Sequence, residues 1–199
     1  MPCLLRTIVI VFLLVGIASC IIATSTPVFR FSMKTTDNGD TAKFTQTILY
    51  FNTLTRTETS MDADGTVTIY EMGKNFRDQP KSCKPRMNAG GALTIVALAS
   101  GILALILSIL YFEQPTNWKF SAVLCTFCLL SFACLLCAFA VAVSVVAYKK
   151  GQDENGDDRF GHCYVGIESN PYRYYVEGFA FTVIGCGFFL FAAVAQIFA

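Results

Sequence analysis

The stretch FSAVLCTFCLLSFACLLCAFAVAVSVVAY, residues 120–148, contains no acidic or basic side chain. An α-helix needs about 20 apolar residues to cross the hydrocarbon core of a bilayer, and it satisfies its own backbone hydrogen bonds there. Three further stretches share this apolar character: residues 4–25, 89–112 and 175–199. We therefore predict an all-α membrane protein in which residues 1–199 form a single domain with four transmembrane helices.

The composition of the whole chain supports this fold class. Of its 199 residues, 54% are hydrophobic and only 15% are charged, whereas a soluble domain carries about 25% charged residues. The net charge of +1 gives no electrostatic support for nucleic-acid binding. The first apolar segment continues past Cys20, where a signal peptide would give way to polar sequence, so we expect an uncleaved membrane anchor.

Four cysteines in the opening stretch form the pattern C-x2-C-x5-C-x2-C over residues 125–137. On a single helix the two pairs point to nearly opposite sides, and Cys128 and Cys134 are about 9 Å apart along the axis. A zinc ion holds four ligands at about 2.3 Å, which one continuous helix cannot provide. We interpret these cysteines as packing side chains and expect no metal site and no cofactor. Cys125 and Cys3 are candidates for palmitoylation.

The polar segments between the spans comprise a long loop 1 (residues 26–88), a short turn and a loop 3 (residues 149–174). Loops 1 and 3 share one side of the membrane because alternate loops do. Cys83 in loop 1 and Cys163 in loop 3 form either a disulfide, which requires an oxidising compartment, or two unrelated thiols. The four basic residues of loop 3 instead favour a cytoplasmic position for this loop, by the positive-inside rule.

Within loop 1, residues 60–71 read SMDADGTVTIYE and allow two interpretations. Asp62, Asp64 and Glu71 match positions of a calcium-binding EF-hand loop, although the first position lacks its usual Asp. The Asp-Gly pair is also a strong hairpin signal, and the Thr-rich sequence on either side favours strands over helices. We favour a β-hairpin and keep a weak calcium site as the alternative.

Three local stretches resemble known families of four-span membrane proteins. They are RMNAGGAL (residues 86–93), LLC with the small residues that follow it (135–137), and YVEGFAF (175–181). These stretches are similar to the span ends of the claudin and peripheral myelin protein superfamily and of the amastin surface proteins. Loop 1 has no Trp and a single Cys, so it lacks the first-loop signatures of both families. The resemblance implies a left-handed four-helix bundle with a small extracellular β-sheet, formed mainly by loop 1 and used for protein–protein contact. Partly on this ground, we expect loops 1 and 3 to be extracellular or lumenal and both chain ends to lie inside.

The expected function follows from the spans and from the loops. Small residues in the spans allow close helix packing, and the spans contain no catalytic constellation. We expect a non-enzymatic membrane protein of the plasma membrane with a structural, adhesive or accessory-subunit role. Its partners would be the lipid bilayer and either other membrane proteins or further copies of itself. The alternative is a small transporter or channel-modulating subunit in which Glu177 or Arg6 faces a water path.

Overall fold

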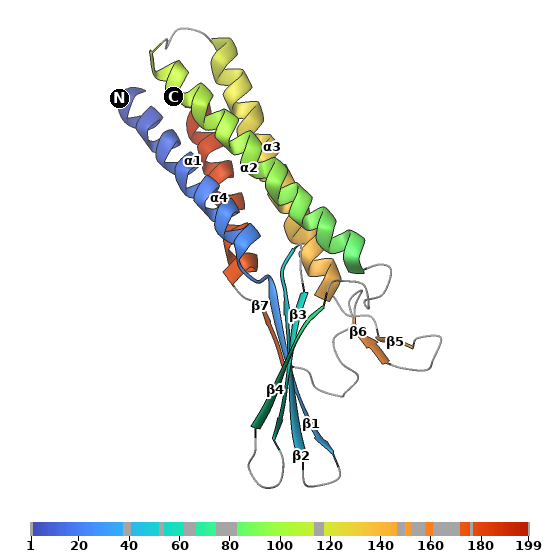
Figure 1. Ribbon diagram of the computed structural model, residues 1–199. Coiled ribbons are helices and arrows are strands. Elements are labelled where there is room, and N and C mark those ends of the chain that lie inside the picture. Colours follow the sequence, from blue (N-terminus) through green and yellow to red (C-terminus); the bar gives the residue numbers. More distant parts are fainter. Residues whose placement is uncertain are drawn as a thin grey trace.

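In the computed structural model of the protein, four long helices stand side by side and a β-sheet projects from one end of them (Figure 1). The structure describes residues 2–37, 41–51, 54–61, 67–74, 83–113, 118–146, 150–152, 158–160, 172–175 and 177–198. The helices are α1 (Pro2–Ser25), α2 (Cys83–Glu113), α3 (Trp118–Val146) and α4 (Glu177–Ile197). All four are long and apolar enough to cross a membrane, which indicates a multi-pass integral membrane protein.

The helix ends differ from the predicted spans in ways that have local causes. Helix α2 begins at Cys83, six residues before the apolar stretch, and Pro85 lies in its first turn, where a missing N–H costs no helical hydrogen bond. Helix α4 begins at Glu177 because Tyr175 belongs to strand β7 (Tyr172–Tyr175). The helix thus begins two residues after the expected start of span 4 at about residue 175, since hydropathy does not separate an aromatic strand from the first turn of a helix.

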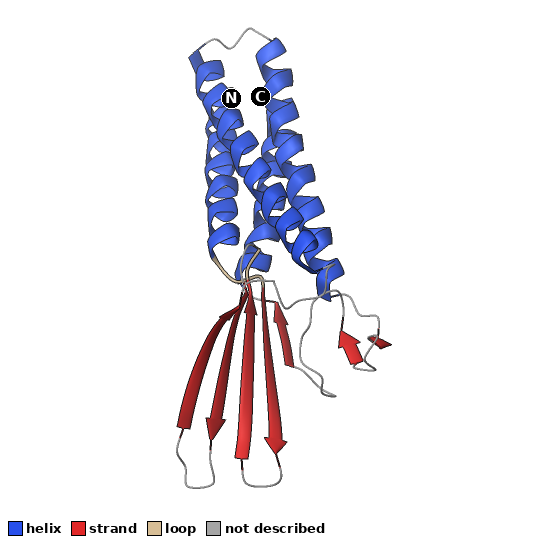
Figure 2. Cartoon of the chain, turned by 45° about the vertical axis from the view of Figure 1, so that its right-hand side comes forward, coloured by secondary structure: helices blue, strands red, loops and turns tan. Residues whose placement is uncertain are grey.

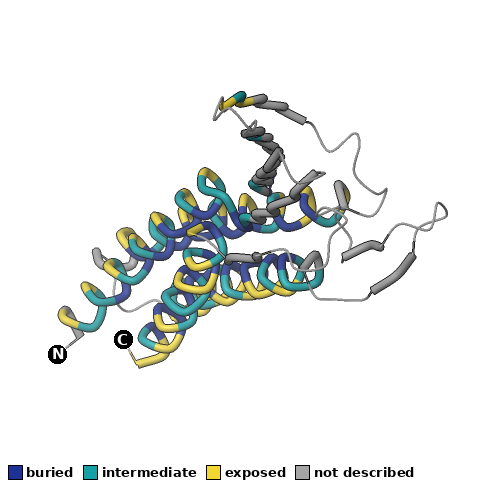
Figure 3. Tube along the Cα trace, turned by 90° about the horizontal axis from the view of Figure 1, so that it is seen from below, coloured by how far each residue is buried: buried dark blue, intermediate teal, exposed yellow. Residues whose placement is uncertain are grey.

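Each helix buries one side against the bundle and exposes the other, as the alternating colours along the helices in Figure 3 show for the described residues. Helices α1 and α4 pack together, as do α2 and α3, and the ring is closed by α3 with α4 and by α1 with α2. The buried core combines a few large side chains with many small ones: Val9, Leu13, Cys20, Ala97, Ala104, Leu124, Cys128, Leu135, Phe189 and Ala192. The outward faces carry exposed Ile, Leu, Val and Phe side chains, as contact with lipid requires.

Loop 1 folds into four of the five strands of an antiparallel sheet (Figure 2). Its strands are β1 (Phe29–Asp37), β2 (Thr41–Leu49), β3 (Leu54–Met61) and β4 (Val67–Lys74), and the sheet order is β4-β3-β2-β1-β7. Strand β7 comes from loop 3 and pairs with β1, which links the two loops at one end of the bundle. Two short strands of loop 3, β5 (Lys150–Gln152) and β6 (Asp158–Phe160), form a separate hairpin.

Candidate functional site

The first contact between the sheet and the bundle is made by the backbone before β1. The N–H of Gly178 in α4 donates a hydrogen bond of 2.9 Å to the carbonyl of Pro27. A Cβ at Gly178 would lie 2.8 Å from that carbonyl oxygen and 2.9 Å from the carbonyl oxygen of Thr26. Because these atoms belong to the backbone, they cannot rotate away. Glycine at this position therefore holds the start of β1 against the start of α4.

A second contact is made by Phe51, which lies between β2 and β3 and is buried. A Cβ at Gly90 would lie 2.7 Å from Cε1 of the Phe51 ring, and a Cβ at Gly91 would lie 3.1 Å from Phe51 Cβ. The two glycines give α2 a flat surface on which this aromatic side chain rests. The Gly-Gly pair in the family-like stretch thus has a local purpose, which is to dock the sheet.

Aromatic rings continue this junction across the bundle. Phe29 of β1 stacks at a tilt on Phe179 of α4, with ring centroids 6.0 Å apart, and Phe179 stacks on Phe139 of α3 at 5.2 Å. Such aromatic pairs contribute about 0.5–1.5 kcal/mol each beyond the area that they bury. Arg86 of α2 adds a hydrogen bond of 3.2 Å from Nη1 to the hydroxyl of Ser144 in α3. Through these contacts the sheet is held on α4 and α2, and α3 is joined to both of those helices beside the junction.

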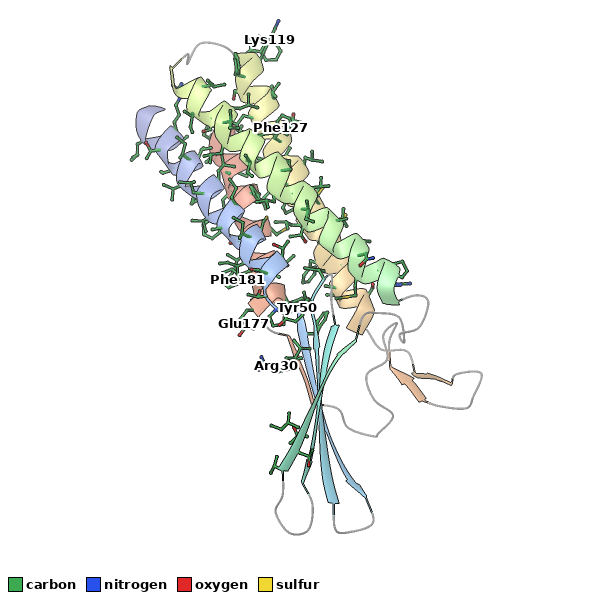
Figure 4. The ribbon with its side chains drawn as sticks, in the orientation of Figure 1. Arg30, Tyr50, Lys119, Phe127, Glu177 and Phe181 are labelled. Carbon is green, nitrogen blue, oxygen red and sulfur yellow. The ribbon has the colours of Figure 1, made fainter. Side chains whose placement is uncertain are left out.

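Charged side chains of the helices mark the two ends of the bundle. Every charged residue of α1 to α4 lies within five residues of a helix end. Figure 4 shows Glu177 of α4 at the end that faces the sheet, near the start of the sheet where Arg30 of β1 lies, and Lys119 of α3 at the opposite end. Glu177 is the first residue of α4 and is exposed, where its carboxylate is favoured by the helix dipole. Arg30 is half-buried, and its Nε has no hydrogen-bond partner in the described part of the chain.

Polar groups inside the bundle pair with one another across helices. The hydroxyls of Ser100 in α2 and Ser131 in α3 are 2.7 Å apart and buried. At the end away from the sheet, Nε2 of Gln196 in α4 donates to the hydroxyl of Ser121 in α3 at 2.9 Å. Interhelical hydrogen bonds in membranes contribute about 0.6 kcal/mol on average. These pairs fix how α3 is placed along its neighbours.

The centre of the bundle is filled by Phe189 of α4, which is fully buried. A Cβ at Gly101 of α2 would lie 2.7 Å from Cζ of this ring, and a Cβ at Gly16 of α1 would lie 3.1 Å from it. Two glycines on different helices therefore enclose one aromatic ring. Gly185 permits a similar approach, because its Cβ would meet Leu135 at 3.1 Å and Ser19 at 3.2 Å.

The four cysteines of the opening pattern occupy different sides of α3. Cys128 and Cys134 are buried, and Cys137 is exposed. The thiol of Cys125 lies two turns inside α3 and donates to the carbonyl of Ala193 in α4 at 3.9 Å. Palmitoylation at Cys125 stays a prediction. Among the described residues, no group of three or more His, Cys, Asp or Glu side chains is placed to hold a metal ion.

The remaining predicted sites fall wholly or partly outside the described residues. Cys83 is the first residue of α2, but its side chain lies outside the described part, as do the side chain of Cys3 and all of Cys163. Asp62 and Asp64 also lie outside it, between the paired ends of β3 and β4. Glu71 is in β4, with its backbone paired to Thr57. An EF-hand loop has a helix on each side, whereas residues 62–66 have a strand on each side, which is the setting of a β-hairpin.

No protein-family model matches the chain, and no curated protein matches it. The arrangement of the bundle, the sheet and the junction between them is therefore the basis for its proposed function.

Proposed function

We propose that this protein is a non-enzymatic, four-span membrane protein that presents its sheet for contact with other proteins. The observation that carries the proposal is the sheet itself, a single layer that extends away from the helices (Figures 1 and 2). Its attachment through Gly178, Phe51 and Phe29 gives it a fixed position on the bundle. A rigid platform of this kind suits a structural, adhesive or accessory-subunit role.

We further propose that the sheet faces the outside of the cell at the plasma membrane, with both ends of the chain inside. The combination of a four-helix bundle with a sheet made mainly from loop 1 supports the proposed kinship with the claudin and amastin families. An outside position would also allow a disulfide between Cys83 and Cys163, because such bridges persist in oxidising compartments. Mass spectrometry of non-reduced peptides from the purified protein tests the bridge, and free thiols at both positions would contradict it.

The proposed role is tested by recovering partners from native membranes with the tagged, full-length protein. Gly90→Ala places a methyl group 2.7 Å from the Phe51 ring but at an ordinary 3.7 Å from Val141 of α3, so it should undock the sheet while the helices still pack. Gly187→Ala is the matched control, because a Cβ there would meet nothing within 4 Å. Wild type and the control should recover the same proteins, or further copies of the chain, and the undocked variant should lose them.

Size-exclusion chromatography in mild detergent must first show that both variants are monodisperse. The proposed role is wrong if wild type recovers no protein above the untagged background. It is also wrong if undocking the sheet leaves every partner bound.

A further inference from the structure

By strand register, apolar residues gather on one face of the sheet at the end away from the helices. The ladder pairs Ala42 with Met61 and Met61 with Val67, so these three positions lie in one row across β2, β3 and β4. The next row pairs Phe44 with Thr59 and Thr59 with Ile69. Directly paired residues share a face of a sheet. We call this face the Val67 face.

The side chains described at the margin of this patch are open to solvent. Val67 is 53% exposed and Ile69 is 63% exposed. Figures 1 and 2 show this end of the sheet as a single layer, well away from the helices. A sheet with an apolar face normally buries that face against a second layer. At Val67 and Ile69, therefore, no second layer from the described residues covers this face.

By strand register, residues of opposite charge flank these apolar positions on the same face. Lys34 of β1 pairs with Phe44, so it lies in the row of Ile69 at one margin. Glu71 of β4 pairs with Thr57, one row closer to the helices, at the other margin. The Val67 face is thus basic on one side, apolar in the middle and acidic on the other side.

We infer that the Val67 face is the interface between two copies of this chain in the same membrane, related by a two-fold axis along the membrane normal. A rotation about this axis leaves the distance of every residue from the membrane unchanged, and it places β1 of one copy opposite β4 of the other. Lys34 then faces Glu71 of the second copy, and the contact occurs twice. The two rows differ in height by about 7 Å and packed sheets are about 10 Å apart, a separation that a Lys and a Glu side chain together can span.

The charge pattern distinguishes this arrangement from a contact between two opposed membranes. An axis that lies in the plane of the membrane and across the strands would place β1 opposite β1 and β4 opposite β4. That arrangement sets lysine margin against lysine margin, which is unfavourable. The charge pattern therefore favours a second copy in the same membrane over a copy in an opposed membrane.

The area of the Val67 face indicates that the pair should form in a membrane and not in dilute detergent. Four strands about 4.8 Å apart and about eight residues long cover roughly 500 Å² per copy, less than the roughly 800 Å² per partner of a stable interface. The contact should be weak in dilute detergent. Confinement of both copies to one bilayer, with the sheets at one height, raises their effective concentration and favours pairing.

This inference rests on the proposed contact role of the sheet, and charge reversal tests it separately. The full-length chain, labelled at its N-terminus with a donor or acceptor fluorophore, is reconstituted into liposomes, and association is measured by energy transfer. K34E alone and E71K alone each place like charges at both contacts, so each should self-associate about tenfold less than wild type. A mixture of K34E with E71K restores two attractive contacts and should associate like wild type, as should the double variant K34E/E71K.

Chemical cross-linking gives the geometry. T59C lies near the proposed axis on the Val67 face, and E58C lies one residue away on the opposite face. A short bifunctional maleimide should cross-link T59C above the level of the unsubstituted protein and leave E58C at that level. Circular dichroism and size exclusion confirm that each variant is folded before it is compared.

The inference is overturned if wild type shows no self-association in liposomes, or if the mixture of K34E with E71K associates no better than either variant alone. Equal cross-linking at T59C and E58C would also overturn it. If these outcomes are accompanied by recovery of other proteins from native membranes, the contact role stands and only the identity of the partner is wrong.

Discussion

Gly101→Ala should destabilise the helix bundle by overpacking its centre. The new methyl group would lie 2.7 Å from Cζ and 2.8 Å from Cε1 of Phe189, about 1 Å closer than the usual separation of two carbon atoms in contact. The ring cannot retreat towards α1, because Gly16 already lies against it there. A Cβ built at Gly16 would lie 3.1 to 3.2 Å from the same ring. Overpacking of this kind costs about 1–3 kcal/mol, and 2 kcal/mol corresponds to roughly a thirtyfold change in the unfolding equilibrium constant.

The assay is equilibrium unfolding in mixed micelles with increasing sodium dodecyl sulfate, followed by circular dichroism. Gly187→Ala makes the same chemical change on α4 at a position with nothing within 4 Å, so it should unfold like wild type. Adding Phe189→Leu to Gly101→Ala removes the clashing ring and should recover part of the lost stability. Equal stability of Gly101→Ala and Gly187→Ala would refute the placement of Phe189 between the two glycines.

Three further variants test the junction and the interior. Gly178→Ala should detach the start of β1 from α4, because its Cβ would lie 2.8 Å from a backbone carbonyl oxygen. We expect faster hydrogen exchange at β1 and β7, with unchanged exchange in α2 and α3. Unchanged exchange at β1 would contradict this prediction. Gly90→Ala should displace Phe51 and speed proteolysis of loop 1, measured against Gly187→Ala; equal cleavage rates would count against the docking role of Phe51. Ser100→Ala and Ser131→Ala should show a coupling energy of about 0.6 kcal/mol in a double-mutant cycle, and strictly additive effects would exclude a hydrogen bond between them.

The apolar spans could be predicted from the sequence because the bilayer imposes a simple requirement on length and composition. The stretch from residue 120 to 148 contains no charge and forms most of α3, as predicted. The separation of its cysteines around one helix also followed from the helical period. Both properties depend only on local sequence and on the surrounding solvent.

The packing partners could not be predicted, because they depend on contacts distant in sequence. Gly90, Gly101 and Gly178 were visible as small residues suited to close helix packing, but nothing local indicated that Phe51 and Phe189 would fill the space beside them. The assignment of Tyr175 to a strand rather than to span 4 depends likewise on β1, which lies far away in the chain. A glycine shows where the chain permits a close approach, and only the fold shows what approaches.

The side of the membrane on which the sheet lies is the claim on which the proposed contact role most depends. Thr68 lies in β4 next to the Val67 face but on the opposite face of the sheet, so a proposed dimer would leave it accessible. Trp118 is 73% exposed at the other end of the bundle. A membrane-impermeant maleimide applied to intact cells should label T68C directly and W118C only after the membrane is permeabilised. Labelling of W118C in intact cells, with T68C protected until permeabilisation, would contradict the proposal that the sheet faces outside.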